Sequence, residues 1–144
     1  MPTIYVINPN STEAITAAID EALEPLRSND GPEIECLTLA EGPPGMESQR
    51  DVDSVIGPLL KRAATLENHA AAFVIACFSD PGLHSLREQS ARAVFGIAEC
   101  GVLTALSLAR RFGVIAILPA SIPRHLRYFG AMGVTARLAP AASV

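Results

Sequence analysis

The nine-residue run from Ala70 to Phe78 carries no charged side chain, and it constrains the fold more than any other segment. It is less than half as long as a membrane-spanning helix, and the turn-forming residues Asp80, Pro81 and Gly82 follow it. A strand without charge is typical of a parallel sheet that helices cover on both faces. We therefore expect residues 71–77 to form a central parallel strand.

Short apolar runs alternate with helical patterns along the rest of the chain. Further strands are predicted at residues 4–7, 33–39, 93–97, 113–118 and 134–138. Helices are predicted at about residues 13–26, 51–66, 83–89, 99–110 and 121–132. The first of these helices carries an apolar stripe that comprises Ile15, Ala18, Ile19, Ala22 and Leu26. The order predicts an α/β fold, a parallel sheet with helices on both faces.

Composition narrows the function classes. The 144 residues are 49% hydrophobic and 18% charged, which is typical of a globular protein and excludes a disordered chain. The net charge of −4, with no basic cluster larger than Arg110–Arg111, argues against nucleic-acid binding. The first residues lack the pattern of a signal peptide, and three cysteines without a C-x-x-C spacing favour neither disulfides nor zinc. We expect a cytoplasmic protein that binds no metal, nucleic acid or membrane.

Two segments at the carboxyl ends of predicted strands could bind a ligand. Residues 8–12 (Asn-Pro-Asn-Ser-Thr) offer amides, hydroxyls and a helix N-terminus that attracts anions, although a plain turn with Ser11 or Thr12 as helix cap also fits. Cys77 ends the apolar strand before a helix start, where a thiol pKa can fall and a thiolate can act as base or nucleophile. A buried core cysteine is the alternative interpretation.

The other cysteines are weaker candidates. Cys36 lies in the middle of a predicted strand, where it would be inert, and Cys100 lies near a strand-to-helix junction, where helix packing is the simpler role. The segment of residues 42–45 (Gly-Pro-Pro-Gly) is either a flap over the crevice or an ordinary loop.

Several motifs occur in the order found in hydantoin and allantoin racemases. Residues 8–11 resemble the Asn-Pro-Asn-(Ser/Thr) opening of that family, and residues 42–48 resemble its Gly-Pro…Ile-Glu-Ser segment. Residues 76–83 resemble the segment around the first catalytic cysteine, and residues 94–99 are similar to Pro-Val-x-Gly-Ile-x-Glu. The resemblance covers nearly the whole chain, and the ordered set is more specific than any single motif.

The resemblance implies membership of the aspartate/glutamate racemase superfamily and a cofactor-independent inversion next to a carbonyl. In that mechanism one cysteine thiolate removes the α-proton and a second cysteine thiol returns a proton on the opposite face. By position, the resemblance makes Cys77 one catalytic base. It assigns substrate binding to Asn8, Asn10, Ser11, Phe78 and Ser79. The substrate would be a small amino-acid derivative of the hydantoin, allantoin or Asp/Glu type.

The family has two similar lobes, and the resemblance divides this chain unevenly between them. Residues 1–111 would form a complete first lobe, and residues 112–144 the incomplete beginning of a second. The second cysteine of the family would fall beyond Val144, so we expect the 144-residue chain to be a weak or inactive racemase. The chain also has Ala93 and Ala116 where the family commonly has Pro and Thr.

Two other functions remain open. A one-cysteine decarboxylase of the arylmalonate type needs a single proton donor, but that type retains the cysteine of the second lobe. Alternatively, the chain is a non-catalytic remnant or small-ligand-binding module that self-associates. An incomplete second lobe would leave Val114, Ile115 and Ile117 uncovered, and such surfaces are buried in oligomers. We therefore expect a homo-oligomer.

Overall fold

The computed structural model describes residues 2–139 and 142–143, and it contains two parallel sheets. The four-stranded sheet has the order β2-β1-β3-β4, and the two-stranded sheet pairs β5 with β6. The strands are β1 (Thr3–Asn8), β2 (Glu33–Thr38), β3 (Ala70–Ile75), β4 (Ala93–Gly96), β5 (Ile115–Ala116) and β6 (Ala142–Ser143). Every described pairing is parallel, which confirms the predicted α/β class.

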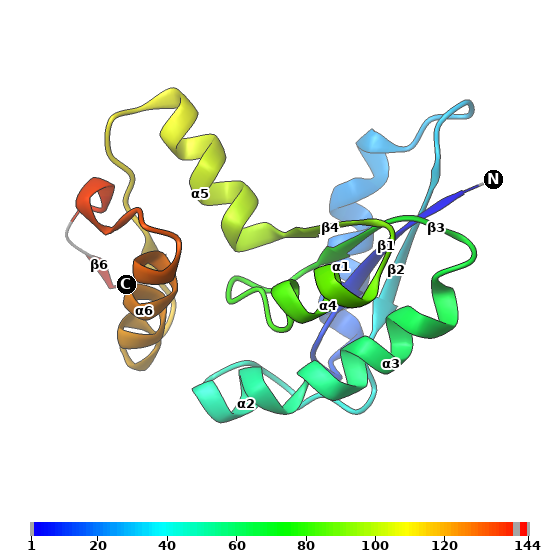
Figure 1. Ribbon diagram of the computed structural model, residues 1–144, viewed down its shortest axis with the longest axis horizontal. Helices are drawn as coiled ribbons and strands as arrows, with labels where there is room; N and C mark the ends of the chain where they lie inside the picture. Colours follow the sequence, from blue (N-terminus) through cyan, green and yellow to red (C-terminus); the bar gives the residue numbers. More distant parts are fainter. Residues whose placement is uncertain (1, 140–141, 144) are drawn as a thin grey trace.

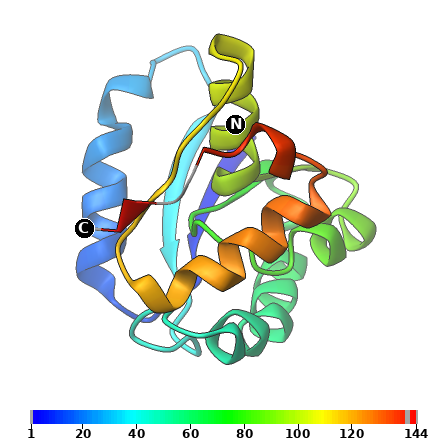
Figure 2. The ribbon, with the colours of Figure 1, turned by 90° about the vertical axis from the view of Figure 1, so that its left-hand side faces the viewer.

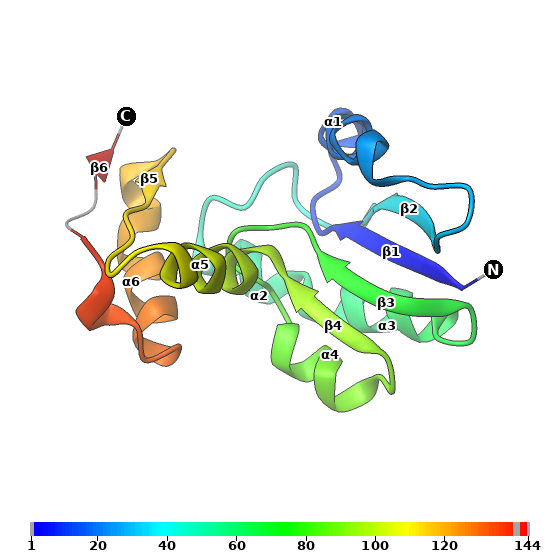
Figure 3. The same cartoon turned by 90° about the horizontal axis from the view of Figure 1, so that it is seen from above.

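Helices lie on both faces of the four-stranded sheet. The helices of the described chain are α1 (Glu13–Leu23), α2 (Gln49–Ser54), α3 (Ile56–Leu66), α4 (Leu83–Gln89), α5 (Ile97–Leu108) and α6 (Ile122–Ala131). Figure 3 shows α1 on one face, and α3 and α4 on the other. The strand order explains this arrangement, because the chain steps one way from β1 to β2 and the opposite way from β2 through β3 to β4. Right-handed crossovers then place the connecting helices on opposite faces.

The main core fills the space between the sheet and the α3–α4 layer. Alternate strand residues point into it. The fully buried members from the strands are Ile7, Phe73 and Ile75, and those from the helices are Val55, Leu59, Ala63 and Leu86. The absence of charge from β3 follows from its place between β1 and β4.

The α1 side of the sheet is much less covered. Thr16 is the buried residue of α1, and its hydroxyl is 3.0 Å from Asn8 Nδ2 and 2.6 Å from the Thr38 hydroxyl. The apolar stripe of this helix lies mostly in solvent, with Ile15 41% and Leu26 68% exposed. Arg27 adds polar contacts towards the other end, because its guanidinium donates to Asp20 of α1 and, at 3.3 Å, to the Ile34 carbonyl of β2. Polar contacts therefore fix α1 to the sheet, and its apolar stripe has little to pack against.

Three predicted elements differ from the structure. The helix expected at residues 51–66 is two helices, α2 and α3, which are separated at Val55. The first of them begins earlier than expected, at Gln49, because Ser48 and Asp51 form a capping box. The strand expected at residues 134–138 is wrong, since Thr135–Arg137 forms a 3-10 helix and β5 pairs with Ala142–Ser143 instead. The strand expected at residues 113–118 is reduced to Ile115–Ala116.

A second, smaller core lies beyond α5. Val102, Phe112 and Phe129 are its buried members. Figure 1 shows α5 connecting the four-stranded sheet to this part of the molecule, and Figure 2 shows α6 with the short strands beside it. The predicted lobe boundary at 111/112 stays a prediction, and residues 140, 141 and 144 of the predicted second lobe lie outside the described residues. In the described part of the chain, every helix is too short or too polar to cross a membrane.

Candidate active site

Cys77 lies two residues beyond β3, at the carboxyl edge of the sheet rather than at the last position of the strand. The Ala76 N–H still donates to the Ile7 carbonyl at 2.9 Å, so the cysteine directly follows the last sheet hydrogen bond. The Asp80 N–H donates to the Cys77 carbonyl at 3.0 Å and closes a turn. Asp80 and Gly82 adopt positive φ angles of 43° and 71°, which reverse the chain into α4. This turn places the thiol at the edge of the sheet instead of in the core.

The thiol lines a cleft of about 300 Å³ between the two parts of the molecule. Phe78 and Ser79 from the same turn line it as well. The remaining lining residues come from two distant segments, and they are Met46, Glu47, Ile115, Ile117, Leu118, Ser121, Arg124 and His125. A second hollow of about 220 Å³ adjoins it and shares Ser79, Arg124 and His125. The structure therefore brings Cys77, Phe78 and Ser79 together at one cavity of small-molecule size.

Opposing influences act on the Cys77 thiol. Burial is the largest and raises the pKa of Cys77 above its usual range. Hydrogen bonding from the Ser79 N–H and hydroxyl, together with the positive charge of Arg124, acts to lower the same pKa. The thiol is therefore neutral at rest near neutral pH, with donors in place for the thiolate when it forms.

Two side chains of α6 face the same cleft. Burial and the charge of Arg124 lower the pKa of His125, so its imidazole is neutral at pH 7. The His125 ring packs edge-on against Phe78, with ring centroids 5.5 Å apart. His125 Nδ1 is buried and has no hydrogen-bond partner in the described structure. A neutral imidazole of this kind has one nitrogen that donates a hydrogen bond and one that accepts a hydrogen bond.

Asn8, Asn10 and Ser11 do not line the Cys77 cleft. Asn8 is 1% exposed and its amide donates to Asn10 Oδ1 at 3.0 Å and to Thr16 Oγ1 at 3.0 Å. Asn10 Oδ1 also accepts from the Thr12 N–H at 2.9 Å. These bonds order the turn between β1 and α1, whereas the binding roles that the family resemblance implies for the three residues stay predictions.

The Gly-Pro-rich loop joins this turn to the cleft. The Pro43 carbonyl accepts from the Ser11 N–H at 3.0 Å, and the Pro44 carbonyl accepts from the Thr12 hydroxyl at 2.8 Å. A Cβ on Gly42 would lie 2.2 Å from the Pro9 carbonyl oxygen, so only glycine allows this approach. Met46 and Glu47 directly follow this loop and line the cleft. The loop therefore links the turn of residues 8–12, which it contacts, to the cleft that Cys77 lines.

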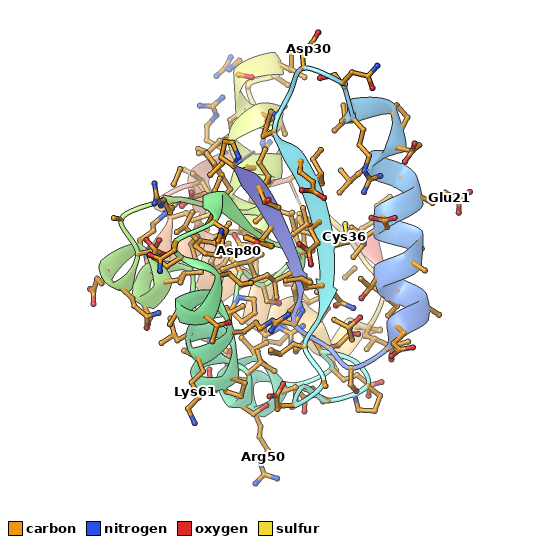
Figure 4. The ribbon with its side chains drawn as sticks, turned by 90° about the vertical axis from the view of Figure 1, so that its right-hand side faces the viewer. Glu21, Asp30, Cys36, Arg50, Lys61 and Asp80 are labelled. Carbon is orange, nitrogen blue, oxygen red and sulfur yellow. The ribbon has the colours of Figure 1, made fainter. Side chains whose placement is uncertain are left out.

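Asp80 holds the Cys77 turn in place (Figure 4). Its buried carboxylate accepts from the N–H groups of Ala98 at 2.9 Å and Glu99 at 2.8 Å, and so caps α5 from a distance. It also accepts a hydrogen bond from the Tyr128 hydroxyl of α6. Burial and this bond raise the pKa of Tyr128 well above its usual range, so the phenol remains a donor. A Cβ on Gly96 would lie 2.2 Å from the Asp80 carboxyl carbon, which explains the glycine.

The other two cysteines lie elsewhere. Cys36 is on β2 (Figure 4) and lines a shallow hollow between this strand and α1 instead of the Cys77 cleft. Cys100 lies in the first turns of α5 and does not line the cleft. Among the described residues, no three His, Cys, Asp or Glu side chains gather where they could hold a metal ion.

The sequence placed Asp80 in the turn after Cys77 but gave it no role, and it did not identify Arg124, His125 or Tyr128 as parts of this region. Arg124 and His125 lie 47 and 48 positions from Cys77, and no motif links those segments. One local signal existed for Asp80, because the glycine at the N-cap of α5 cannot cap the helix itself.

Relatives of known sequence agree with this architecture. The chain is 41% identical over 117 residues to the hydantoin racemase of Pseudomonas sp. (strain NS671), an alignment that covers 81% of this chain and 47% of the relative. It is 38% identical over 122 residues to the hydantoin racemase of Rhizobium meliloti, with 83% and 50% covered. The chain spans about half the length of the curated relatives it matches.

Solved structures and a family model complete the comparison. The allantoin racemase from Klebsiella pneumoniae superposes with a TM-score of 0.90 at 30% identity, over 100% of this chain and 58% of that one. The glutamate racemase from Aquifex pyrophilus shares the fold, with a TM-score of 0.62 at 21% identity over 98% of this chain and 54% of that one. The family model "Asp/Glu/Hydantoin racemase" matches residues 4–144. The chain therefore belongs to the Asp/Glu/hydantoin racemase family.

Proposed function

We propose that Cys77 is a thiol acid–base group for proton transfer at the α-carbon of a small amino-acid derivative, without a cofactor. The observation that carries this proposal is the position of the thiol in a small cleft, next to the Ser79 N–H and hydroxyl. Such donors stabilise the thiolate, and backbone N–H groups at a turn can hold the oxygen of a developing enolate. The printed functions of the relatives favour a hydantoin or allantoin as the first substrates to test.

Inversion needs a second proton donor on the far side of the α-carbon. Cys36 and Cys100 both lie outside the cleft. We therefore propose that the 144-residue chain transfers protons on one face of the substrate and inverts it slowly or not at all. One-face transfer would replace the α-proton with solvent deuterium while the optical rotation persists.

The test follows both signals in deuterium oxide. Proton NMR measures the loss of the α-proton from each enantiomer of a 5-substituted hydantoin and of allantoin, and polarimetry follows the rotation. Each rate is corrected for the spontaneous rate without protein. We expect exchange of one enantiomer that is faster than inversion and is lost in Cys77→Ala. Exchange equal to the protein-free rate would reject the proposed role of Cys77, and fast Cys77-dependent inversion would reject one-face transfer.

A second candidate function is a non-catalytic module that self-associates and binds a small ligand. The exposure of Ile115 (71%) and Ile117 (88%) beside the cleft favours self-association. Val114 is half-buried against the second core, so it contributes less to this surface than the sequence predicts. The two candidates differ in the deuterium experiment, because a binding module gives no Cys77-dependent exchange.

A further inference from the structure

The guanidinium of Arg124 has donors that no described residue uses. Arg124 lies in the first turn of α6, and its Nη2 donates to the Met46 carbonyl at 3.2 Å across 78 positions of sequence. Its Nε and Nη1 atoms are buried and have no hydrogen-bond partner in the described structure. Buried donors normally find acceptors, because an unsatisfied group costs free energy. Two buried donor atoms without acceptors, on one partly buried guanidinium, therefore point to a ligand.

The charge of Arg124 is also uncompensated. The described ion pairs of arginines involve Arg27, Arg87 and Arg92, and none involves Arg124. Asp51 is near enough for Arg124 to lower its pKa slightly, but the two form no ion pair. An arginine remains protonated at any ordinary pH. The cleft therefore holds a permanent positive charge.

The groups around this charge leave room for an anion. His125 is neutral at pH 7 because burial lowers its pKa. Glu47 is the acidic side chain among the residues that line the cleft, and it is exposed at the rim, where water screens its charge. Cys77 is a neutral thiol at rest because burial raises its pKa. The buried Asp80 carboxylate also raises the pKa of Cys77, but Asp80 does not line the cleft and its oxygens accept from Ala98, Glu99 and Tyr128. Arg124 is therefore the basic residue that lines the cleft, and its charge has no ion-pair partner among the described residues.

We propose that Arg124 is the anion-binding residue of the Cys77 cleft, and that it binds the carboxylate of a small acidic substrate. This inference deepens the proposed function by naming a substrate class, amino-acid derivatives with a free carboxylate, and it rests on that function for the reaction alone. A 5-substituted hydantoin whose side chain ends in a carboxylate belongs to this class, whereas allantoin and hydantoins with neutral side chains do not. Carboxylates match guanidinium donors in charge and in planar geometry. The bound carboxylate supplies hydrogen-bond acceptors for the Nε and Nη1 atoms of Arg124, which have none among the described residues.

Alkylation of Cys77 tests the charge without any need for catalysis. Iodoacetate is anionic and iodoacetamide is its neutral analogue. In both reactions the thiolate sulfur attacks the CH₂ carbon, a C–S bond forms, the C–I bond breaks, iodide leaves, and the thiol proton goes to solvent. Mass spectrometry of peptide digests gives the rate at each cysteine separately. The ratio of the two rates cancels the thiolate fraction, which any change at Arg124 also alters.

We expect Arg124→Gln to lower the iodoacetate-to-iodoacetamide ratio at Cys77 about tenfold. Arg124→Lys keeps the charge and should retain most of the ratio. Arg62→Gln removes a charge from an exposed position on α3 and serves as the matched control. Cys36 and Cys100 act as internal references, and their ratios should not change. An unchanged ratio at Cys77 in a folded Arg124→Gln variant would overturn the proposal.

A protection experiment on the unaltered chain covers the case in which Arg124→Gln fails to fold. Sodium acetate should slow the reaction of Cys77 with iodoacetamide, whereas acetamide or sodium chloride at equal concentration should not. Equal effects of acetate and chloride would reject carboxylate binding. The two experiments can reject the two proposals independently. If acetate protects Cys77 but no deuterium exchange occurs, proton transfer by Cys77 is rejected and the anion site stands. If Cys77-dependent exchange occurs but acetate gives no protection, the anion site is rejected and proton transfer stands.

Discussion

At the scale of single residues, Asp80 connects the Cys77 turn to two helices, α5 and α6. It satisfies two N–H groups at the start of α5 and accepts from the Tyr128 hydroxyl. We expect Asp80→Ala to lower the free energy of unfolding by about 2–4 kcal/mol, because the buried donors lose their acceptor. Tyr128→Phe removes a single bond and should cost about 1 kcal/mol. Urea unfolding followed by circular dichroism measures both.

Asp30 supplies the matched control. It is exposed in the turn before β2 (Figure 4), where Asp30→Ala should change the free energy of unfolding by no more than about 0.5 kcal/mol. Equal effects of Asp80→Ala and Asp30→Ala would show that the remote cap contributes nothing to stability.

The protonation of Cys77 gives a second prediction at this scale. An ordinary thiol has a pKa of about 8.5, and burial raises the pKa of Cys77 above its usual value. The alkylation rate of Cys77 should therefore still be rising at pH 8.5, by about tenfold per pH unit as long as the pH is below the pKa of Cys77. Cys36 offers a reference, since burial and Asp20 raise its pKa to about 11. A midpoint for Cys77 below pH 8 would contradict the burial argument.

The same shift affects stability in a defined direction. A thiol whose pKa is raised by folding holds its proton in the folded state after the unfolded chain has lost it. The free energy of unfolding should therefore fall as the pH rises above the ordinary thiol pKa. Urea midpoints at pH 7 and pH 9.5, compared between the unaltered chain and Cys77→Ala, measure the contribution.

At the scale of elements, α5 has one glycine at its N-cap and another inside it, in opposite situations. A Cβ on Gly96, at the N-cap, would overlap the Asp80 carboxylate, whereas a Cβ on Gly101 would meet nothing within 4 Å. Gly101→Ala should raise the free energy of unfolding by about 0.5–1 kcal/mol, because alanine favours the helix. Gly96→Ala should lower it by more than this. Thermal unfolding gives both values, and a stabilising Gly96→Ala would contradict the described packing.

The elements also show how far sequence reasoning reaches. Uncharged runs located β1 and β3 because burial on both faces favours an uncharged composition, whereas β4, at the edge of the sheet, alternates exposed and buried residues. The start of α2 at Gln49 was missed, although the Ser48-x-x-Asp51 spacing is a capping signal. The strand predicted at residues 134–138 failed because tertiary contacts decide the state of such a short apolar segment. Local patterns predicted the elements of the four-stranded sheet, and the short strands β5 and β6 depend on distant partners.

The candidate site divides in the same way. Cys77, Phe78 and Ser79 are adjacent in sequence, and a strand-to-helix junction is a recognisable place for a ligand. Arg124 and His125 reach the cleft from α6 through long-range packing, which no single-sequence pattern encodes. The position of Asn8 away from the cleft follows from its hydrogen bonds to Asn10 and Thr16, which only coordinates reveal.

At the scale of the whole molecule, exposed apolar surface predicts association. Ile115 and Ile117 lie in solvent on the second part of the chain. The double variant Ile115→Lys/Ile117→Lys should increase the monomer fraction in sedimentation velocity at micromolar concentration, because charge opposes burial of this surface. Thr104→Lys, exposed on α5, is the control. An unaltered chain that sediments as a monomer at all concentrations would reject self-association through these residues.

The shared carboxylate of Asp80 has a consequence for recombining members of this family. The residues at positions 80, 96 and 128 should be exchanged together. Glycine at position 96 leaves room for the Asp80 carboxylate, and the Tyr128 hydroxyl donates a hydrogen bond to that carboxylate. A chimera that takes the cysteine turn from one parent and α5 from another should fold only when the second parent also carries glycine at position 96. Substitutions at the three positions should therefore be strongly epistatic, although they are 16 and 32 residues apart along the chain.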